Sequence, residues 1–218
     1  MKRSDEGWWA MSKNLIITIS REYGSGGREI AKNLAQKLGL AYYDTLLIKR
    51  LAQESGLCDA AVKSYDEKPV DRFLFSPNRF LSGIEVNSLV ELEVHKAEVA
   101  LLRKIADEGP CVIVGRRADS ILDFQPGLVS VFVSAPLPDR VKRVMSRNRI
   151  DEASAKMRIT ETDKARASYH NDFSTKPWGK ASTYDLCINS EPLSISSTVD
   201  VLASYLQKFL YEYPEVSG

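Results

Sequence analysis

Residues 14–39 of the chain read NLIITISREYGSGGREIAKNLAQKLG. The first part of this stretch, Asn14 to Ser20, is a short β-branched run before a glycine-rich turn, which is typical of a buried parallel strand. From Arg28 to Leu38 the apolar residues recur at helical spacing, and Gly39 follows where a helix commonly ends. The stretch therefore predicts a strand, a glycine-rich loop and a helix.

The rest of the chain continues this alternation of strands and helices. Short apolar runs predict four more strands, at residues 41–43, 111–114, 128–134 and 184–189. Amphipathic patterns predict further helices at residues 45–56, 85–108, 137–148, 152–172 and 196–212. Such alternation indicates an α/β fold with a parallel sheet and helices on both of its faces.

Length and composition indicate one domain. The chain has 218 residues, which suits a single α/β domain, and 44% of them are hydrophobic, which suffices for a core. We interpret residues 1–13 as an N-terminal extension and residues 14–218 as one domain. Within it, we expect residues 45–108 to form a helical insert, in which residues 57–83 are short helices and loops that cover a cleft. We expect residues 137–183 to form a lid region.

Charge and cysteine content limit the class of protein. Lys and Arg number 30, Asp and Glu number 29, and the net charge of +1 favours neither nucleic acid nor a membrane surface as partner. No segment approaches the roughly 20 apolar residues that span a bilayer. The three cysteines, Cys58, Cys111 and Cys187, form no CxxC pair, which predicts a reducing, cytoplasmic location. The oligomeric state stays open.

The glycine-rich loop has the features of a phosphate cradle. Glycines let backbone N–H groups point at one centre, and the helix that follows adds positive charge at its N-terminus. If Gly27 is the last glycine of the pattern G-x-x-x-x-G-K-[ST], Arg28 takes the Lys position and Glu29 the Ser/Thr position. Arg28 can hold phosphate oxygens bidentately, and Ser25 is the remaining source of a hydroxyl for Mg²⁺. The alternative is a glycine turn that packs the helix on the strand. The predicted phosphate-binding residues are Gly24, Ser25, Gly26, Gly27, Arg28 and Glu29.

Two adjacent arginines follow the third predicted strand, in the stretch GRRAD of residues 115–119. Ligands of open α/β sheets bind beyond the carboxyl ends of the strands. Arg116 and Arg117 at such an end favour a substrate phosphate as their partner. The alternative is an ion pair with Asp119 or Asp123.

Arginines also lie on the two helices predicted at residues 137–148 and 152–172. Arg143 and Arg147 lie on the first helix, while Asp163, Arg166 and His170 share one face of the second. Together they can form a lid whose cations neutralise a transferring phosphoryl group and whose closure excludes water. The alternative is that Asp163 and Arg166 form an ordinary pair on the helix surface.

Two further polar residues have simpler interpretations. Asp44 ends the second predicted strand, where it either caps the following helix or binds a nucleoside. His95 lies in a long helix without neighbouring Cys or His, which favours a structural role. The sequence contains no metal-ligand spacing.

Six blocks of the sequence resemble the bacterial cytidylate kinase-like family, a relative of true cytidylate kinases and other nucleoside monophosphate kinases. The resemblance extends from about Leu15 to about Tyr205. The blocks are ITISREYGSGGREIA, YYD, VIVGRRADSIL, VFVSAP, TDKARASY and YDLCIN.

The resemblance implies a P-loop NTPase fold of three layers, with strand order 2-3-1-4-5, an acceptor-binding insert and a helical lid. It implies ATP and Mg²⁺ as co-substrates and CMP or dCMP as the phosphoryl acceptor. By this resemblance Gly24 to Arg28 hold ATP phosphates, and Arg28 acts in catalysis with the lid residues Arg147 and Arg166. The residues predicted to bind the acceptor are Asp44, Arg116, Arg117 and Asp163.

Three functions agree with these features. The first is a nucleoside monophosphate kinase, the second is a P-loop kinase for another small acceptor, and the third is a nucleotide-binding module with little catalysis. Fold analogy alone does not separate them.

Overall fold

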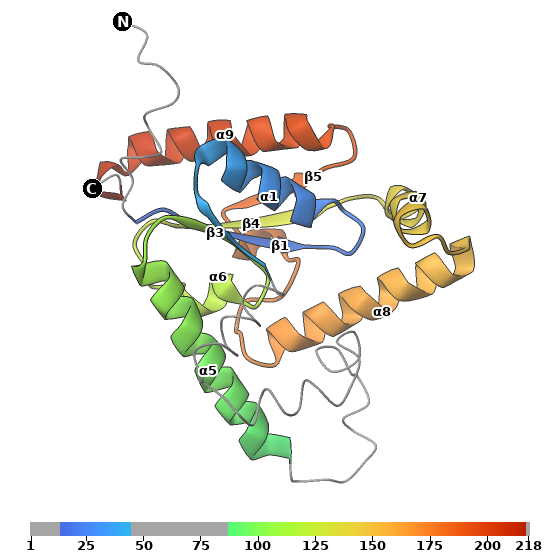
Figure 1. Ribbon diagram of the computed structural model, residues 1–218, viewed down its shortest axis with the longest axis horizontal. Helices are drawn as coiled ribbons and strands as arrows, with labels where there is room; N and C mark the ends of the chain where they lie inside the picture. The colour runs from blue at the N-terminus through green and yellow to red at the C-terminus, as the bar shows by residue number, and fades with distance from the viewer. Residues whose placement is uncertain (1–13, 45–86, 217–218) are drawn as a thin grey trace, which may run out of the picture.

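The computed structural model describes residues 14–44 and 87–216 of the chain (Figure 1). Within these residues a single parallel sheet has the strand order β2-β3-β1-β4-β5, which confirms the predicted order. The strands are β1 (Ile16–Arg21), β2 (Ala41–Tyr43), β3 (Cys111–Val114), β4 (Leu128–Ser134) and β5 (Leu186–Asn189).

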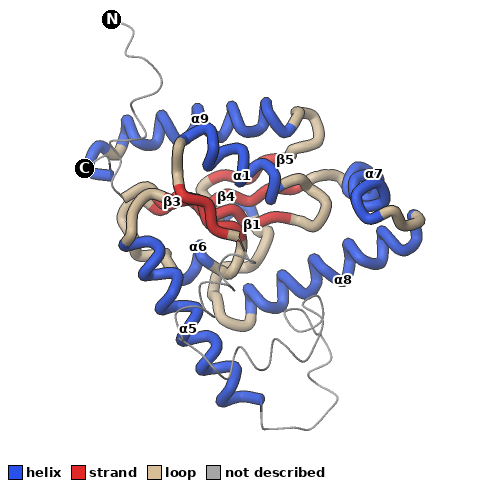
Figure 2. The backbone as a smooth tube through the Cα atoms, viewed as in Figure 1, coloured by secondary structure: helices blue, strands red, loops and turns tan. Residues whose placement is uncertain are grey.

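Helices cover the sheet on both faces, as Figures 1 and 2 show. Helices α1 and α9 lie on one face and α5 and α6 on the other, while α7 and α8 lie beyond the carboxyl ends of the strands. Their bounds are α1 (Gly27–Leu38), α5 (Asn87–Asp107), α6 (Ala118–Ile121), α7 (Leu137–Asn148), α8 (Glu152–Asn171) and α9 (Ile195–Glu212), with 3₁₀ turns η3 (Ala181–Thr183) and η4 (Pro214–Val216). This is the three-layer architecture of P-loop proteins.

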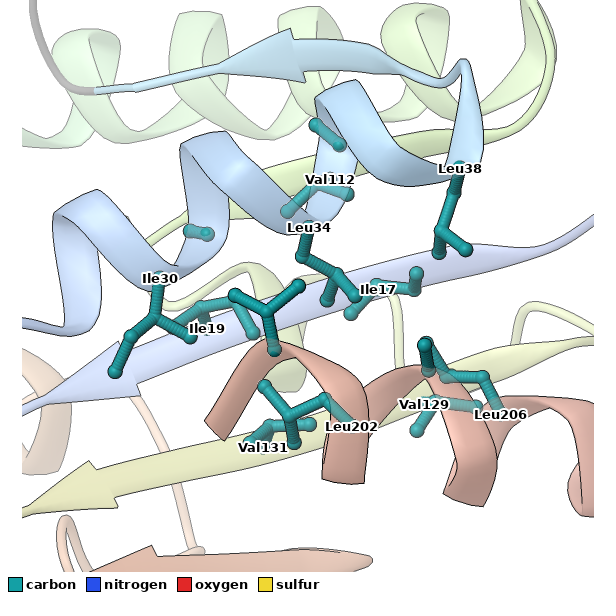
Figure 3. Close-up of a cluster of buried hydrophobic side chains, with 14 of the residues drawn as sticks. Ile17, Ile19, Ile30, Leu34, Leu38, Val112, Val129, Val131, Leu202 and Leu206 are labelled. Atoms are coloured by element: carbon teal, nitrogen blue, oxygen red, sulfur yellow. The ribbon is translucent and has the colours of Figure 1, made fainter. Parts of the chain in front are cut away.

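The alternation of side chains along β1 explains the two-sided core. Ile17 and Ile19 point toward α1 and α9, where they contact residues such as Leu34 and Leu202 (Figure 3). Ile16 points to the opposite face, which α5 and α6 cover. A central parallel strand is covered on both faces, and accordingly Ile16 to Ser20 are all buried, the polar Thr18 and Ser20 included.

The observed elements differ little from the predicted ones. Strand β1 is shifted toward its carboxyl end, β5 begins two residues later than predicted, and the four-residue helix α6 was not predicted. The N-terminal extension, the helix predicted at residues 45–56 and most of the insert lie outside the described residues. The domain boundaries therefore stay predictions.

Across residues 14–44 and 87–216, no helix combines the length and apolar character needed to cross a membrane.

Candidate functional site

The loop between β1 and α1 depends on glycine at two positions. Gly24 and Gly26 both have φ of +85°, in the left-handed region that other residues rarely adopt. A Cβ at Gly24 would lie 3.0 Å from the carbonyl oxygen of Arg140, and one at Gly26 would lie 2.7 Å from Ile195 Cδ1. Gly26 is also the N-cap of α1. The glycines thus permit a tight loop that ends at the helix N-terminus.

Backbone N–H groups of this loop are available to a ligand. Among the hydrogen bonds within residues 14–44 and 87–216, none is donated by the backbone N–H of Gly24, Gly26 or Arg28. These groups lie at or just before the first turn of α1, where the helix dipole favours negative charge. The loop therefore offers backbone donors to an anion, and its binding of the phosphate chain of a nucleotide stays a prediction.

Ser25 is a poor candidate for a Mg²⁺ ligand. Its side chain is fully buried, its hydroxyl donates to the Glu22 carbonyl at 2.9 Å, and its own carbonyl accepts from Ser190 Oγ at 2.6 Å. The hydroxyl thus holds the loop in shape. Glu29 is exposed on the first turn of α1, and its contact with a Mg²⁺ or nucleotide stays a prediction.

The structure brings Arg28 and Asp44 together. Nε of Arg28 donates to Oδ2 of Asp44 at 3.0 Å, and a second guanidinium nitrogen bonds the same oxygen. The Arg28 side chain is 59% exposed and is directed to the end of β2. Thus Arg28 pairs with a predicted acceptor-site residue, and its contact with ATP stays a prediction.

A left-handed turn follows β3. Gly115, Arg116 and Arg117 have φ values of 73°, 60° and 54°. Two successive non-glycine residues in this region are costly, at about 1–2 kcal/mol each. Such strain persists only where the surrounding structure holds it, and it is common at functional sites.

Arg117 is enclosed by other side chains. Its Nη2 donates to Glu98 Oε2 at 2.9 Å and lies 2.8 Å from His95 Nδ1. Its guanidinium carbon lies 4.7 Å from the ring centroid of Tyr169 and 4.6 Å from that of Phe173. With 2% of its side chain exposed, Arg117 has a structural partner in Glu98, and its contact with substrate stays a prediction.

Arg116 shares the same carboxylate. Its Nη1 donates to Glu98 Oε1 at 3.3 Å, and 8% of its side chain is exposed. The surface ion pairs considered as an alternative do not form, because Asp119 bonds His170 Nε2 at 2.9 Å and Asp123 pairs with Lys176. The carboxylate that binds both arginines of this turn belongs to Glu98 on α5, which lies 18 positions before Arg116 and 19 before Arg117 in the sequence.

Helices α7 and α8 bring three arginines to the loop. Arg143 Nη1 donates to the Gly24 carbonyl at 2.5 Å, and Arg166 Nη1 donates at 2.9 Å to the last carbonyl of β1. The guanidinium carbons of Arg147 and Arg166 lie 5.0 Å and 5.5 Å from the ring centroid of Tyr23. Burial lowers the pKa of Arg166 to about 10. The predicted lid arginines therefore lie beside the phosphate cradle.

Asp163 anchors the loop to the lid. It accepts the Tyr23 backbone N–H at 2.7 Å and forms an ion pair with Arg140, which also lies 3.5 Å from Glu22. The ordinary surface pair between Asp163 and Arg166 is therefore not its main interaction. That Asp163 contacts substrate stays a prediction.

Sequence reasoning did not identify two residues that lie at the centre of this arrangement. Glu98 belongs to a segment whose sequence shows only an amphipathic helical pattern, and nothing in that pattern distinguishes it from other charged residues of the helix. Arg21 was visible as a cation at the end of a buried strand, directly before the glycine loop. Burial lowers the pKa of Arg21, and the charges of Arg166, Arg116 and Arg28 lie close enough to lower it further. Several cations and backbone donors thus lie around the loop, and such groups can stabilise a multiply charged anion.

Comparison with known proteins identifies relatives along most of the chain. The model of the cytidylate kinase-like family matches residues 16–192. A cytidylate kinase of Methanopyrus kandleri is 26% identical over 208 residues, which are 91% of this chain and 96% of the relative.

Solved structures share the fold. An uncharacterised protein from Eubacterium ventriosum is 27% identical, with a TM-score of 0.69 over 88% of this chain and 98% of the other. A shikimate kinase from Acinetobacter baumannii, in complex with shikimate, is 11% identical, with a TM-score of 0.52 over 91% of this chain and 96% of the other. The second likeness concerns the fold alone.

Proposed function

The chain belongs to the cytidylate kinase-like family, and from that premise we propose that it transfers a phosphoryl group from ATP to a nucleoside monophosphate, CMP or dCMP. The observation that carries the proposal is the loop itself. The N–H groups of Gly24, Gly26 and Arg28, which bond no described residue, lie at the start of α1 beside Arg143 and Arg166. A cradle with side-chain cations beside it suits the phosphate chain of a nucleoside triphosphate.

In this proposal the protein acts by positioning and charge stabilisation. The loop amides hold the donor phosphates, and Arg147 and Arg166 neutralise charge that develops on the transferred group. Bound ATP supplies the phosphoryl group, and Mg²⁺ neutralises its phosphate oxygens. No covalent intermediate on the protein is required, because in-line placement of the two nucleotides removes most of the entropic barrier.

The acceptor would lie at the ends of β2 and β3. Arg116 extends from the left-handed turn after β3 and would bind the acceptor phosphate, while Asp44 and Arg28 lie at the end of β2. Glu98 holds Arg116 ready at 3.3 Å, so the phosphate must draw Arg116 partly from that carboxylate. Asp44 positions the acceptor rather than acting as a general base.

A kinase for another small acceptor is the second candidate. It is favoured by the pairing of both Arg116 and Arg117 with Glu98, because an acceptor phosphate would have to compete with a carboxylate that already binds them. The third candidate, a weakly catalytic binding module, is favoured by the direction of Arg28, whose side chain bonds Asp44.

A panel of acceptors tests the proposal. ADP release is measured from ATP and Mg²⁺ with each of CMP, dCMP, UMP, AMP, GMP and shikimate. We expect turnover with CMP or dCMP, reduced by roughly 100-fold or more in Arg116→Ala, since a charge-assisted contact in the transition state is lost. Arg103→Ala, which removes an exposed arginine of α5, is the matched control and should retain activity.

If no acceptor of the panel gave turnover while a thermal-shift assay still showed ATP binding, the activity of a nucleoside monophosphate kinase would be excluded. Turnover with shikimate alone would support the second candidate. The expected partners are small nucleotides, not nucleic acid or membrane. A cytoplasmic location stays a prediction that agrees with the need for ATP.

A further inference from the structure

The first residue of α1 is a glycine, so it offers no cationic side chain to the phosphate loop. Helix α1 begins at Gly27, and the left-handed Gly26 is its N-cap. In the pattern G-x-x-x-x-G-K-[ST] the lysine directly follows the last glycine, where the helix opens. Counted from the helix start, Gly26 is that last glycine and Gly27 takes the lysine position. Arg28 is then one residue further on, and its side chain bonds Asp44 instead.

The side chain of Arg21 occupies the space that a residue at position 27 would need. A Cβ at Gly27 would lie 2.7 Å from Arg21 Cβ and 3.1 Å from Arg21 Cγ. The guanidinium then extends to the end of β3, where a Cβ at Gly115 would collide with Arg21 Nη1. Glycine at both positions therefore leaves a path for Arg21 from the loop to the turn that carries Arg116.

Arg21 has no anionic partner in the protein as described. Within residues 14–44 and 87–216 its guanidinium forms neither a hydrogen bond nor an ion pair. The side chain is partly buried, and burial, followed by the charges of Arg166, Arg116 and Arg28, lowers its pKa well below the usual value. A cation held among cations is unfavourable unless an anion binds between them.

The other arginines of the site already have acceptors. Arg28 bonds Asp44, Arg116 bonds Glu98, Arg143 bonds the Gly24 carbonyl, and Arg166 bonds the carbonyl of Arg21. Arg21 differs from all four, because no described group accepts a hydrogen bond from its guanidinium.

We propose that Arg21 supplies the side-chain cation of this phosphate loop, binding the terminal phosphate oxygens of the donor nucleotide from the end of β1 in place of a lysine at position 27. This inference rests on the proposed function for the identity of the donor. Because the guanidinium reaches Gly115, next to Arg116, it lies between the donor cradle and the predicted acceptor phosphate. Arg21 would therefore contact the group in transfer.

The test measures binding of tripolyphosphate by calorimetry, together with thermal stability, in the full chain. Arg21→Met removes the charge and keeps the length of the side chain. We expect it to weaken tripolyphosphate binding roughly 10- to 100-fold and to slow phosphoryl transfer roughly 10²- to 10³-fold, as loss of a transition-state donor does. Lys32→Met, which removes an exposed cation of α1, is the matched control and should bind tripolyphosphate within about twofold of the unaltered protein.

Thermal stability separates a binding role from a structural one. Removing a repelled, partly buried charge should leave the melting temperature of the ligand-free Arg21→Met protein unchanged or raise it. A fall in melting temperature with unchanged tripolyphosphate affinity would overturn the proposal. So would loss of affinity in Arg28→Met with none in Arg21→Met.

A rescue variant tests the position itself. Arg21→Gly combined with Gly27→Lys removes the Cβ and Cγ of residue 21 that a side chain at position 27 would meet, and it supplies a lysine there. We expect the double variant to regain most of the affinity that Arg21→Gly alone loses. Failure of this rescue, with the double variant folded, would contradict the equivalence of the two positions. Charge-dependent tripolyphosphate binding without turnover on any acceptor would reject the proposed function alone, whereas turnover insensitive to Arg21→Met would reject this inference alone.

Discussion

The turn after β3 and the loop after β1 both present arginines at the carboxyl edge of the sheet, but the protein balances their charge differently. In the turn, Glu98 binds Arg116 and Arg117, and aromatic rings enclose the second. In the loop, the described groups that act on the charge of Arg21 are the arginines Arg166, Arg116 and Arg28 and the phenol of Tyr42. An arginine with its own carboxylate can hold the fold together in the absence of ligand, whereas one without a carboxylate requires an anion from outside. The difference therefore separates cations that a carboxylate holds in place before a ligand binds, Arg116 among them, from a cation whose charge a bound anion would balance.

The largest effect on stability is expected at Glu98. Glu98→Ala leaves two buried guanidinium groups and the Tyr169 hydroxyl without their shared acceptor. Removing one partner of a buried ion pair costs about 3–5 kcal/mol of unfolding free energy. Urea denaturation measures the loss. A loss below about 1 kcal/mol would show that the turn does not depend on Glu98 and would remove the contrast with the loop.

A smaller loss of stability is expected at Asp163, the carboxylate that bonds the backbone of the loop. Asp163→Asn keeps an acceptor for the Tyr23 backbone N–H but weakens the ion pair with Arg140. We expect a loss of about 1–3 kcal/mol, typical of hydrogen bonds to charged groups. Amide exchange at Tyr23 should accelerate in the same variant. Unchanged exchange would mean that Asp163 does not hold the loop.

The smallest effect at neutral pH concerns Tyr169, whose pKa is raised by burial and then by the Glu98 charge. The neutral phenol is favoured in the folded state, so its contribution is fully present below about pH 10, where unfolded tyrosine begins to ionise, and is lost above it. The stability advantage of the unaltered protein over Tyr169→Phe should therefore shrink above pH 10, by up to about 1.4 kcal/mol per pH unit.

Denaturation at successive alkaline pH values measures that slope. Tyr211→Phe, at a tyrosine that is 73% exposed, is the matched control and should show no such change. If stability changed with pH equally in both variants, Tyr169 would be in contact with solvent, and the cluster around Arg117 would not be enclosed.

Local sequence was sufficient for most of the fold. The β-branched run of β1, the left-handed glycines and the helical spacing of α1 depend on neighbours within a few residues, so their pattern is visible along the chain. The apolar runs of β3 and β4 were predicted with their observed bounds for the same reason. Helix α6 was not, because four residues are too few to show a period and because a strained turn, not an amphipathic pattern, starts it.

The residues of the site were predicted without their partners in the fold. The sequence predicts that the loop glycines, Arg28, Arg116 and Arg166 lie near a phosphate, and their contact with one stays a prediction. The sequence did not show that Arg28 would turn to Asp44, because moving one position along a helix rotates a side chain by about 100°. A difference of one residue in where α1 begins therefore changes which group faces the loop.

Sequence by itself thus determined the parallel sheet, the glycine loop and the presence of arginines at its carboxyl edge. Tertiary structure alone decided which arginines are balanced, since Glu98, Arg117 and Tyr169 meet from separate elements, whereas Arg21 meets Arg166 and Arg116. Periodicity reports on neighbours a few residues apart, but charge acts over distances in space that only the folded chain sets.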